Sequence, residues 1–398
     1  MGQTLRFGGF MSPLHPVGQD PHVLLQQDFR LTEEMDRLNY DELWVGEHHS
    51  AGWGTISSPE IFIASAAERT ERLRFATGVM ALPYHHPLTA AARAVQLDHL
   101  TRGRFIFGVG AGSVALDMHM LGVAAQDTRA RTEASVEVIQ QLLSGRTVTR
   151  DEGWFSITDG SLQLLPFSRL GLDVTVASAA TPFGMTLAGR LGLNALSHVA
   201  PPWGTVRPGQ SMGLENLASQ WEHLANAAAA AGREVDRSTW RLVVPMHVAE
   251  TREQALDDIE EGWLRQRREL WTDTFGVPMP LSEQASRRAF RSTVDGGGII
   301  AGSPDDAVAA VRRLQDVSGG FGCLLVSVTD WAPFERTLQS LDLFARYVTP
   351  HFTGSVDRLR RSNRAAADDR VRLQESHNSA RQKAITDHEV PVREPAPV

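Results

Sequence analysis

Cysteine and lysine are almost absent from this chain of 398 residues, which contains one of each. A single cysteine excludes an internal disulfide framework, a cysteine-rich zinc site and a Cys-x-x-Cys redox pair. Cys323 lies in the apolar run 322–327, so we expect a small buried hydrophobic residue. The single lysine, Lys383, lies in a polar tail, which argues against Schiff-base chemistry and a P-loop.

Long apolar runs are also missing. No stretch approaches the roughly 18 consecutive apolar residues of a membrane-spanning helix, and no charged N-terminal segment precedes an apolar run. We therefore expect a cytoplasmic protein without a membrane segment. The net charge of −8, with arginines spread along the chain, argues against a nucleic-acid-binding protein.

Short apolar segments alternate with helical patterns along most of the chain. The predicted strands are residues 5–10, 43–45, 73–79, 104–110, 172–177, 193–197, 240–248 and 322–328. This alternation predicts an α/β protein, a (β/α)8 TIM barrel over residues 1–354. A doubly wound sheet is the alternative, but it would require a Gly-x-Gly-x-x-Gly turn after the first strand, and residues 8–13 do not supply one.

Two insertions and a tail depart from the alternation. Residues 145–167 contain short alternating pieces at 154–157 and 162–164, which indicate a hairpin. Residues 271–300 contain Pro278, Pro280 and three consecutive glycines, and they predict a long irregular segment that is either a functional lid or disordered. Residues 355–398 have almost no large apolar residues, which predicts a mobile C-terminal tail or a helical arm over a partner subunit.

Titratable residues follow the second predicted strand directly. Trp44 and Val45 end a buried strand, and Glu47, His48 and His49 come next. In a barrel, strand C-termini carry the active site, so His48 is a candidate for catalysis or cofactor contact. In an extended chain Glu47 and His49 lie on the face opposite His48, so we expect no metal site. The alternative for His48 is a structural histidine at the barrel rim. His85 and His86 also follow a strand, which indicates either rim packing or a supporting hydrogen bond.

Small residues lie at several other strand ends, where they let a flat ligand approach the backbone. They include Gly78-Val79, Gly110-Ala-Gly112 and Ser178-Ala-Ala-Thr181. A helix opens after Thr181, so its backbone N–H groups and the nearby hydroxyls could bind a phosphate, although capping of the helix is the alternative. Trp203 and Trp331 in predicted rim loops, with Trp263 and Trp271 near the second insertion, indicate either an apolar substrate chamber or packing under the loops.

Several of these stretches resemble the bacterial luciferase-like flavin monooxygenase family. They are Trp44-Val-Gly-Glu-His-His49, residues 59–64, Ala76-Thr-Gly-Val79, Leu82-Pro83, His86-Pro87, Leu97-Asp-His-Leu100 and residues 103–110. Later stretches resemble the limonene monooxygenase-like branch, namely Ala177-Ser178, Pro182-Phe-Gly184, Ala188-Gly189, Pro202-Trp203 and residues 346–352. The order and spacing of the motifs are more specific than any one of them, and they cover nearly the whole chain.

The resemblance implies a barrel that uses reduced FMN, delivered by a separate NAD(P)H-dependent flavin reductase, together with O2. His48 matches a histidine that supports the oxygen chemistry of the flavin, and Glu47 beside it is the second expected catalytic residue. The implied cofactor contacts, including a non-proline cis peptide at Gly78-Val79, are Met11, Gly78, Val79, Gly110, Ala111, Ser178, Ala179, Thr181, Gly184 and Met185. The expected substrate contacts are Trp53, His86, Trp203 and Trp331. Luciferase carries an arginine where this chain has Ala111, so the phosphate would rely on backbone groups and hydroxyls, and FMN would bind weakly.

Three functions remain open. The first is a two-component FMN monooxygenase that inserts one oxygen atom into an apolar, natural-product-like substrate by hydroxylation, epoxidation or Baeyer–Villiger insertion. The second is a deazaflavin-dependent oxidoreductase that transfers hydride on the same fold. The third is a flavin-storing or partner-binding barrel without catalysis. The resemblance favours the first and also implies a homodimer that pairs through rim helices. Fold analogy does not itself fix function.

Overall fold

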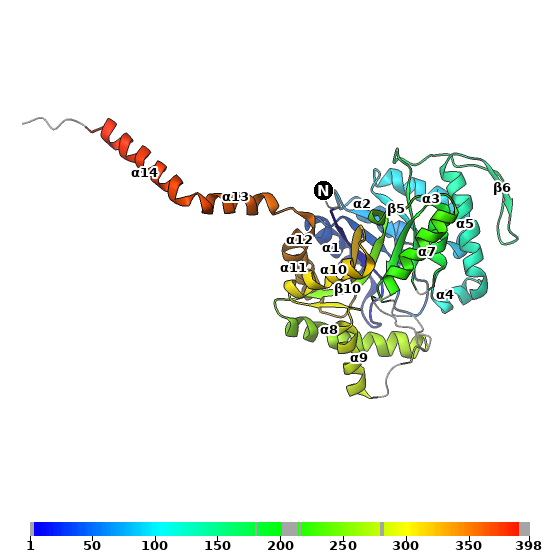
Figure 1. Cartoon of the computed structure of the whole chain (residues 1–398). Coiled ribbons are helices and arrows are strands. Elements are labelled where there is room, and N and C mark those ends of the chain that lie inside the picture. Colours follow the sequence, from blue (N-terminus) through cyan, green and yellow to red (C-terminus); the bar gives the residue numbers. More distant parts are fainter. Residues whose placement is uncertain (1–3, 180, 201–213, 215, 279–281, 390–398) are drawn as a thin grey trace, which may run out of the picture. The chain divides into compact units, whose positions relative to one another are not determined.

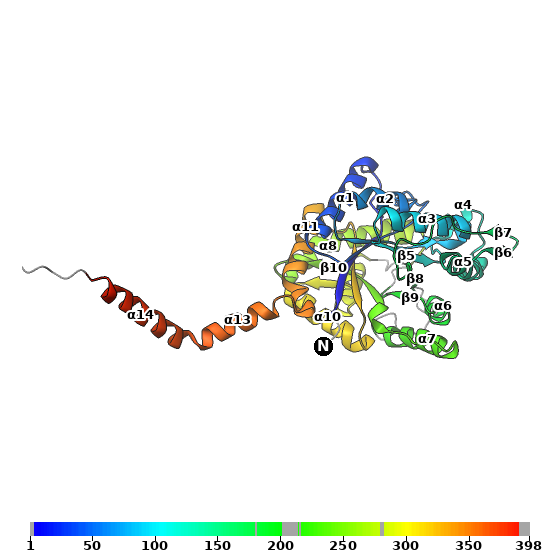
Figure 2. The same ribbon diagram turned by 90° about the horizontal axis from the view of Figure 1, so that it is seen from above.

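The structure is a computed structural model that describes residues 4–179, 181–200, 214, 216–278 and 282–389. The chain forms two compact units, Met1–Phe352 and Thr353–Val398. The first unit contains a closed parallel barrel surrounded by helices (Figures 1 and 2). Trp203, expected to contact substrate, lies outside the described residues.

Ten described strands share the main sheet. Two of these lie outside the ring: β4 (Met80–Ala81) pairs with β5 (Phe105–Gly110), and β11 (Ile300–Gly302) pairs with β10 (Arg241–Val248). The other eight strands form the ring, in which neighbouring strands are parallel and pair all the way around, so that the ring is closed. In order around the ring, the strands are β1 (Arg6–Met11), β2 (Glu42–Val45), β3 (Arg74–Thr77), β5 (Phe105–Gly110), β8 (Asp173–Ser178), β9 (Asn194–His198), β10 (Arg241–Val248) and β12 (Cys323–Val328). The predicted barrel is confirmed.

Helices cover the outside of the ring (Figure 2). They begin as the sequence dictates: Ser303 caps α10 in a reciprocal capping box with Asp306, and Pro304 occupies its first turn. The major helices are α1 (Pro21–Arg37), α2 (Pro59–Ala67), α3 (Pro87–Leu100), α5 (Thr128–Leu143), α6 (Phe183–Leu191), α7 (Asn216–Ala230), α8 (Arg252–Gln266), α10 (Pro304–Ser318) and α11 (Phe334–Leu343). Shorter elements are α4 (Ala115–Met120), α12 (Pro350–Thr353), the 3₁₀ turns Leu82–Tyr84, Ala125–Asp127 and Arg237–Thr239, and the π-helical turns Arg267–Thr274 and Phe344–Val348.

Strand alternation separates two apolar cores. In β12, Leu324 and Val326 belong to the core between strands and helices, whereas Cys323 and Leu325 pack inside the ring with Trp44. Cys323 is fully buried there, and burial raises the pKa of its thiol. The prediction of a small buried residue at Cys323 is therefore confirmed.

Charged residues fill the barrel at the N-terminal ends of its strands. The fully buried Arg241 of β10 donates from Nε to Glu42 Oε2 at 2.8 Å and from Nη2 to Asp173 Oδ2 at 2.8 Å. Burial opposes ionisation of Asp173, but Arg241 and Arg74 more than offset it and lower its pKa to about 2. In barrel enzymes this end serves stability. Sequence reasoning did not find this network, because its members lie in different strands.

Two sequence predictions about the insertions need correction. The first insertion does form an antiparallel hairpin, but its strands are β6 (Val148–Asp151) and β7 (Ser156–Gly160), not residues 154–157 and 162–164. The second insertion is largely helical: a π-helical turn reaches Thr274, and α9 spans Glu283–Asp295. Phe290 and Val294 of α9 pack with Ile259 and Trp263 of α8, a periodic apolar face that the flanking prolines and glycines obscured.

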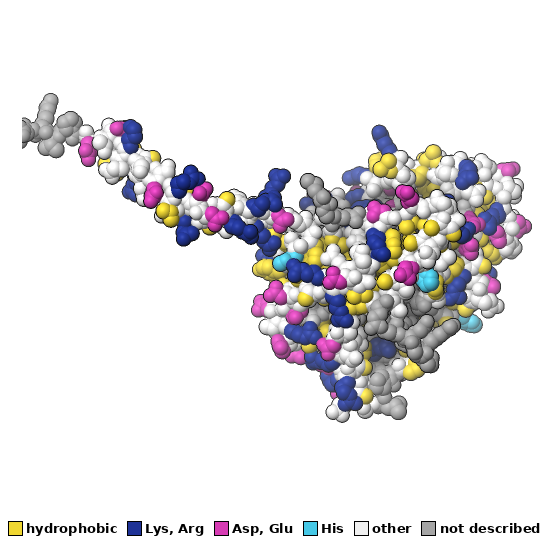
Figure 3. Space-filling model, viewed as in Figure 1, with side chains coloured by type: hydrophobic (Ala, Val, Ile, Leu, Met, Phe, Trp, Pro, Cys, Tyr) yellow, Lys and Arg dark blue, Asp and Glu magenta, His cyan; other side chains and the backbone are white. Residues whose placement is uncertain are grey.

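The second unit contains two exposed helices, α13 (Asp357–Asp368) and α14 (Arg370–Asp387). Arginines line much of this unit, in α13 above all (Figure 3). Among the described residues, no helix has the length and apolar character needed to cross a membrane.

Candidate active site

The second strand delivers the histidine cluster to the C-terminal rim of the barrel. β2 is completely buried up to Val45, and the amide of Gly46 donates to the carbonyl of Met11 at 3.0 Å. A Cβ on Gly46 would lie 3.0 Å from Pro13 Cδ, so a small residue is favoured where the chain leaves the strand. Glu47, His48 and His49 follow at once, in the place where barrel enzymes carry their chemistry.

Glu47 is the buried centre of this cluster. One carboxylate oxygen, Oε1, lies 2.8 Å from His49 Nε2 and 2.9 Å from His85 Nε2, and Oε2 accepts the amide of Ala81 at 3.0 Å. Burial opposes ionisation of Glu47, but the hydrogen bonds from His49 and His85 more than offset it, so its pKa is lowered. The hydrogen bond to Glu47 in turn raises the pKa of His49. Their contact therefore favours the charged forms of both Glu47 and His49.

Arg93 determines how His85 carries its proton. Arg93 Nη2 lies 3.0 Å from His85 Nδ1, and Nη1 donates to Glu60 Oε1 at 2.8 Å. A guanidinium can only donate, so Nδ1 of His85 must accept. The proton of a neutral His85 then lies on Nε2, which donates to Glu47. Of the two readings of His85, the supporting hydrogen bond is the one observed.

His48 faces a different carboxylate, as strand alternation predicts. Its Nδ1 lies 3.8 Å from Asp117 Oδ2, and its side chain retains 22% exposure, so a ligand can reach it. Asp117, on α4, also accepts the hydroxyl of Ser50 and the amide of His49. Burial opposes ionisation of Asp117, but His48 and Ser50 more than offset it and its pKa is lowered. Sequence reasoning missed Asp117 because a single carboxylate in a distant short helix forms no spacing pattern.

The peptide bond Gly78-Val79 is cis, as the resemblance implied. A Cβ on Gly78 would lie 3.0 Å from Trp44 Cβ and 3.2 Å from Phe10 Cε2, so this peptide packs closely on β1 and β2. A Cβ on Gly110 would lie 2.9 Å from Val79 Cγ2. The ends of β1, β2, β3 and β5, including buried Met11, thus bring backbone atoms together where the flavin ring is expected. Ala111 is half-buried beyond Gly110.

The start of α6 is pressed against the end of β8. A Cβ on Gly184 would lie 2.5 Å from the carbonyl oxygen of Ala177, so only glycine fits. Ser178 Oγ donates to the carbonyl of Thr181 at 3.0 Å, which commits its hydrogen to the turn. Thr181 is exposed, Ala179 is half-buried, and Met185 is buried with its sulfur accepting from Ser197 Oγ at 3.5 Å. A phosphate here would therefore meet backbone N–H groups and the Thr181 hydroxyl.

The described residues expected to contact substrate have different immediate partners. Trp53 is buried with Leu270 and Trp271. His86 is exposed, its Nε2 lies 3.3 Å from the carbonyl of Ser156, and its ring packs edge-on against Phe155, so it contacts the hairpin. Trp331 donates to Gln266 Oε1 at 2.9 Å. Their role toward a substrate stays a prediction.

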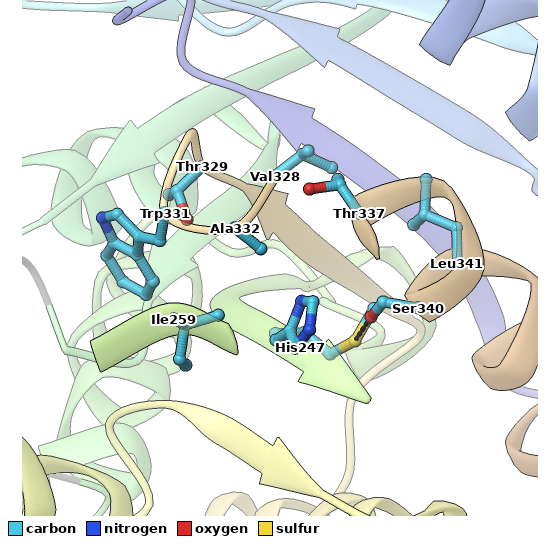
Figure 4. A pocket seen from close by; sticks show the side chains of 10 residues that line it. His247, Ile259, Val328, Thr329, Trp331, Ala332, Thr337, Ser340 and Leu341 are labelled. Carbon is cyan, nitrogen blue, oxygen red and sulfur yellow. Dashed lines mark hydrogen bonds between the residues drawn. The ribbon is translucent and has the colours of Figure 1, made fainter. Parts of the chain in front are cut away.

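Trp331 also lines a small pocket between β10, β12 and helices α8 and α11 (Figure 4). His247 borders this pocket, and its Nε2 lies 3.0 Å from Asp258 Oδ2. The pocket lies on the outer side of the strands, since Met246 and Val328 pack with the core between strands and helices. This pocket is therefore separate from the cluster of Glu47, His48 and His49 at the strand ends.

A further histidine that sequence reasoning missed, His198, ends β9. Burial lowers its pKa to about 4, and its ring meets Phe10 edge-on at 5.3 Å between centroids. His198 is therefore neutral at pH 7. Its position directly after a strand was the signal that could have revealed it.

A closed parallel barrel whose strand ends carry histidines next to buried carboxylates is the arrangement of a barrel enzyme. Residues 5–319 match the family of luciferase-like monooxygenases, so the chain belongs to this family and is a monooxygenase. The chain is 52% identical over 356 residues to 4-hydroxyprotoasukamycin monooxygenase of Streptomyces nodosus subsp. asukaensis, covering 89% of this chain and 94% of that one. It is 42% identical over 373 residues to limonene 1,2-monooxygenase of Rhodococcus erythropolis, covering 91% and 92%. The predicted family and branch are thus confirmed.

Solved structures share the fold. One is the oxygenating constituent of 3,6-diketocamphane monooxygenase of Pseudomonas putida, a type II Baeyer–Villiger monooxygenase in complex with FMN. It superposes with a TM-score of 0.72 at 23% identity, and the match covers 87% of this chain and 98% of that one.

Proposed function

We propose that the protein is the oxygenase component of a two-component system, which uses reduced FMN and O2 to insert one oxygen atom into an apolar, natural-product-like substrate. A separate NAD(P)H-dependent flavin reductase supplies the reduced FMN. The observation that carries the proposal is the arrangement at the strand ends: His48 lies 3.8 Å from the carboxylate of Asp117 after β2, and the Gly78-Val79 peptide and Gly110 are tightly packed at the ends of β3 and β5. The oxygenating constituent of 3,6-diketocamphane monooxygenase, which binds FMN on the same fold, supports an oxygenase that is separate from its reductase.

The residues at the rim fit a flavin. A side chain at Gly78, Gly110 or Gly184 would collide with its neighbours, so the backbone is bare where a flat ring and a phosphate are expected. The Tyr84 hydroxyl is a buried donor without a partner among the described residues. Met11, Val79, Ala111, Ala179, Thr181 and Met185 would complete the contacts. Bound reduced flavin would supply the activation of O2.

The chain's own residues would control protons and water. Asp117, held as an anion, faces His48 Nδ1, which favours a proton on that nitrogen and leaves Nε2 to exchange a proton with a ligand. Glu47 does not face the ligand, since its side chain is 1% exposed; it positions His49 and His85. Trp53 and Trp271 pack together in one buried cluster and would exclude water from the flavin site.

The substrate class rests on the relatives. Identities of 52% and 42% to monooxygenases named for 4-hydroxyprotoasukamycin and limonene favour a natural-product-like, largely apolar substrate. Hydroxylation, epoxidation and Baeyer–Villiger insertion are the three outcomes that this chemistry allows. Tryptophans 53, 203 and 331 and His86 are the proposed substrate contacts.

We also propose a cytoplasmic homodimer. Helix α2 is apolar on nearly all sides, and its Ile61 is 68% exposed. A helix that is apolar all round calls for a partner on its outer face.

The test is to bind reduced FMN to the purified protein without oxygen, mix it with O2 and follow absorbance in a stopped-flow instrument. We expect a transient absorption that outlives that of free FMN, and a shorter transient in His48→Ala, which should still bind FMN. Reoxidation as fast as free FMN, or binding of a deazaflavin in its place, would contradict the proposal.

A further inference from the structure

Tyr84 places a buried hydroxyl at the edge of the site. It ends the 3₁₀ turn Leu82–Tyr84, which directly follows β4 and the Gly78-Val79 peptide. Its hydroxyl oxygen is buried and has no hydrogen-bond partner among the described residues. A Cβ on Gly112 would lie 2.5 Å from this oxygen, so the hydroxyl rests against the backbone of the loop that follows β5.

The surroundings of Tyr84 keep it a donor. Its ring meets the His49 ring edge-on at 6.0 Å between centroids. Burial raises the pKa of the phenol, and the nearby carboxylates of Asp117 and Glu47 raise it further. A phenol that stays protonated between two carboxylates offers its hydrogen rather than a negative charge.

A buried hydroxyl without a partner is costly, and native proteins seldom retain one without a ligand or ordered water. Gly112, which contacts the hydroxyl, has a φ of +73°, a conformation that suits glycine. The Tyr84 hydroxyl also leaves no room for a side chain at Gly112. The loop thus exposes bare backbone beside a free donor, two residues beyond Gly110.

We propose that the Tyr84 hydroxyl donates a hydrogen bond to an acceptor oxygen of the bound flavin. This inference rests on the proposed function and adds a cofactor-binding residue that neither the sequence motifs nor the resemblance assigns. The flavin is favoured over the organic substrate because it is rich in acceptor oxygens, whereas an apolar substrate has few. The loop that the hydroxyl contacts also begins at Gly110, which packs on Val79 of the proposed flavin seat.

The test is the Tyr84→Phe variant, which keeps the ring against His49 and Gly112 and removes only the hydroxyl. FMN affinity is measured by quenching of flavin fluorescence, and melting temperature is measured with and without FMN. We expect binding weaker by roughly tenfold, the value of one hydrogen bond. The melting temperature without FMN should be unchanged or higher, because no protein hydrogen bond is lost.

The chain's other tyrosines are matched controls. Tyr40 donates from its hydroxyl to the carbonyl of Leu341 at 3.0 Å, so Tyr40→Phe should lower the melting temperature without FMN. Tyr347 is 52% exposed, so Tyr347→Phe should change neither quantity.

The outcomes separate this inference from the proposed function. If the wild type binds FMN and Tyr84→Phe binds it equally well, the inference is wrong and the proposed function stands. Normal FMN binding with a raised KM for substrate would assign Tyr84 to the substrate instead. A lower melting temperature without FMN, as in Tyr40→Phe, would indicate that the Tyr84 hydroxyl bonds an ordered water in the fold, and the inference would be wrong. Failure of the wild type to bind FMN would overturn both proposals.

Discussion

His15 contacts three other segments of the chain, and replacing it should make the free energy of unfolding less dependent on pH. His15 lies in the loop after β1, where Nε2 is 3.3 Å from Asp28 Oδ2 of α1 and Nδ1 is 3.4 Å from Asp330 Oδ2 after β12. Its amide also donates to the carbonyl of Trp53 at 2.9 Å. A histidine with a carboxylate at each nitrogen must be doubly protonated to donate to both.

The magnitude follows from the pKa of His15. Burial opposes its protonation, but the hydrogen bonds to Asp28 and Asp330 more than offset this and raise the pKa from 6.5 to about 9. At about 1.4 kcal/mol for each tenfold change in proton affinity, the upper bound is about 3 kcal/mol. Burial raises the pKa of Asp28, which offsets part of this gain, so we expect about 2 kcal/mol.

The direction of the pH dependence follows from the pKa of His15, which is higher in the folded state than in the unfolded chain. The stabilisation is complete below pH 6.5 and is lost as the pH rises through about 9. For a unit of the size of Met1–Phe352, about 2 kcal/mol corresponds to a melting-temperature change of about 3 °C.

The assay compares melting temperatures of wild type and His15→Gln between pH 6 and pH 9.5. The wild type should be more stable by about 3 °C at the lower pH, and the difference should shrink at the higher pH. His22→Gln, at an exposed position at the start of α1, is the control and should follow the wild type. A wild-type advantage that is the same at both pH values would refute the reasoning.

Two further changes test the cofactor seat and the dimer. Gly184→Ala puts a methyl group 2.5 Å from the carbonyl oxygen of Ala177; it should displace the start of α6, weaken FMN binding at least tenfold and destabilise the fold by about 1–3 kcal/mol. Thr186→Ala, on the exposed side of the same helix, should do neither, and equal FMN binding by both variants in a fluorescence titration would remove α6 from the site. Ile61→Asp places a charge on exposed α2 and should convert the proposed dimer to monomer by light scattering; a wild type that is already monomeric would contradict the dimer.

The barrel could be predicted from sequence because each strand carries its own signal. Runs such as 322–326 are apolar throughout, as expected of strands covered on both faces, and helices begin at local markers such as Ser303 and Pro304. Helix α9 was missed because prolines and glycines flank it: Ser286, Phe290 and Val294 do mark one face among its arginines. Apolar patterns and helix caps identify strands and helices, but neighbouring prolines and glycines can hide such a pattern.

The site could be predicted only where chemistry follows a strand. His48 and Glu47 come directly after β2, and Gly78-Val79 after β3. Asp117, Arg93 and Tyr84 lie in helices or short turns, and their roles depend on contacts that follow no sequence pattern. Alternation along the chain did separate the side chains of Glu47 and His49 from that of His48, and the two sets of side chains contact different carboxylates.

The most direct test of the proposed function is the reaction of the protein carrying reduced FMN with O2, followed by stopped-flow absorbance beside free reduced FMN. We predict a transient absorption that persists longer in the protein than in free FMN and that is shortened in His48→Ala. Reoxidation of FMN at the same rate with and without the protein would contradict an oxygenase that shields its cofactor.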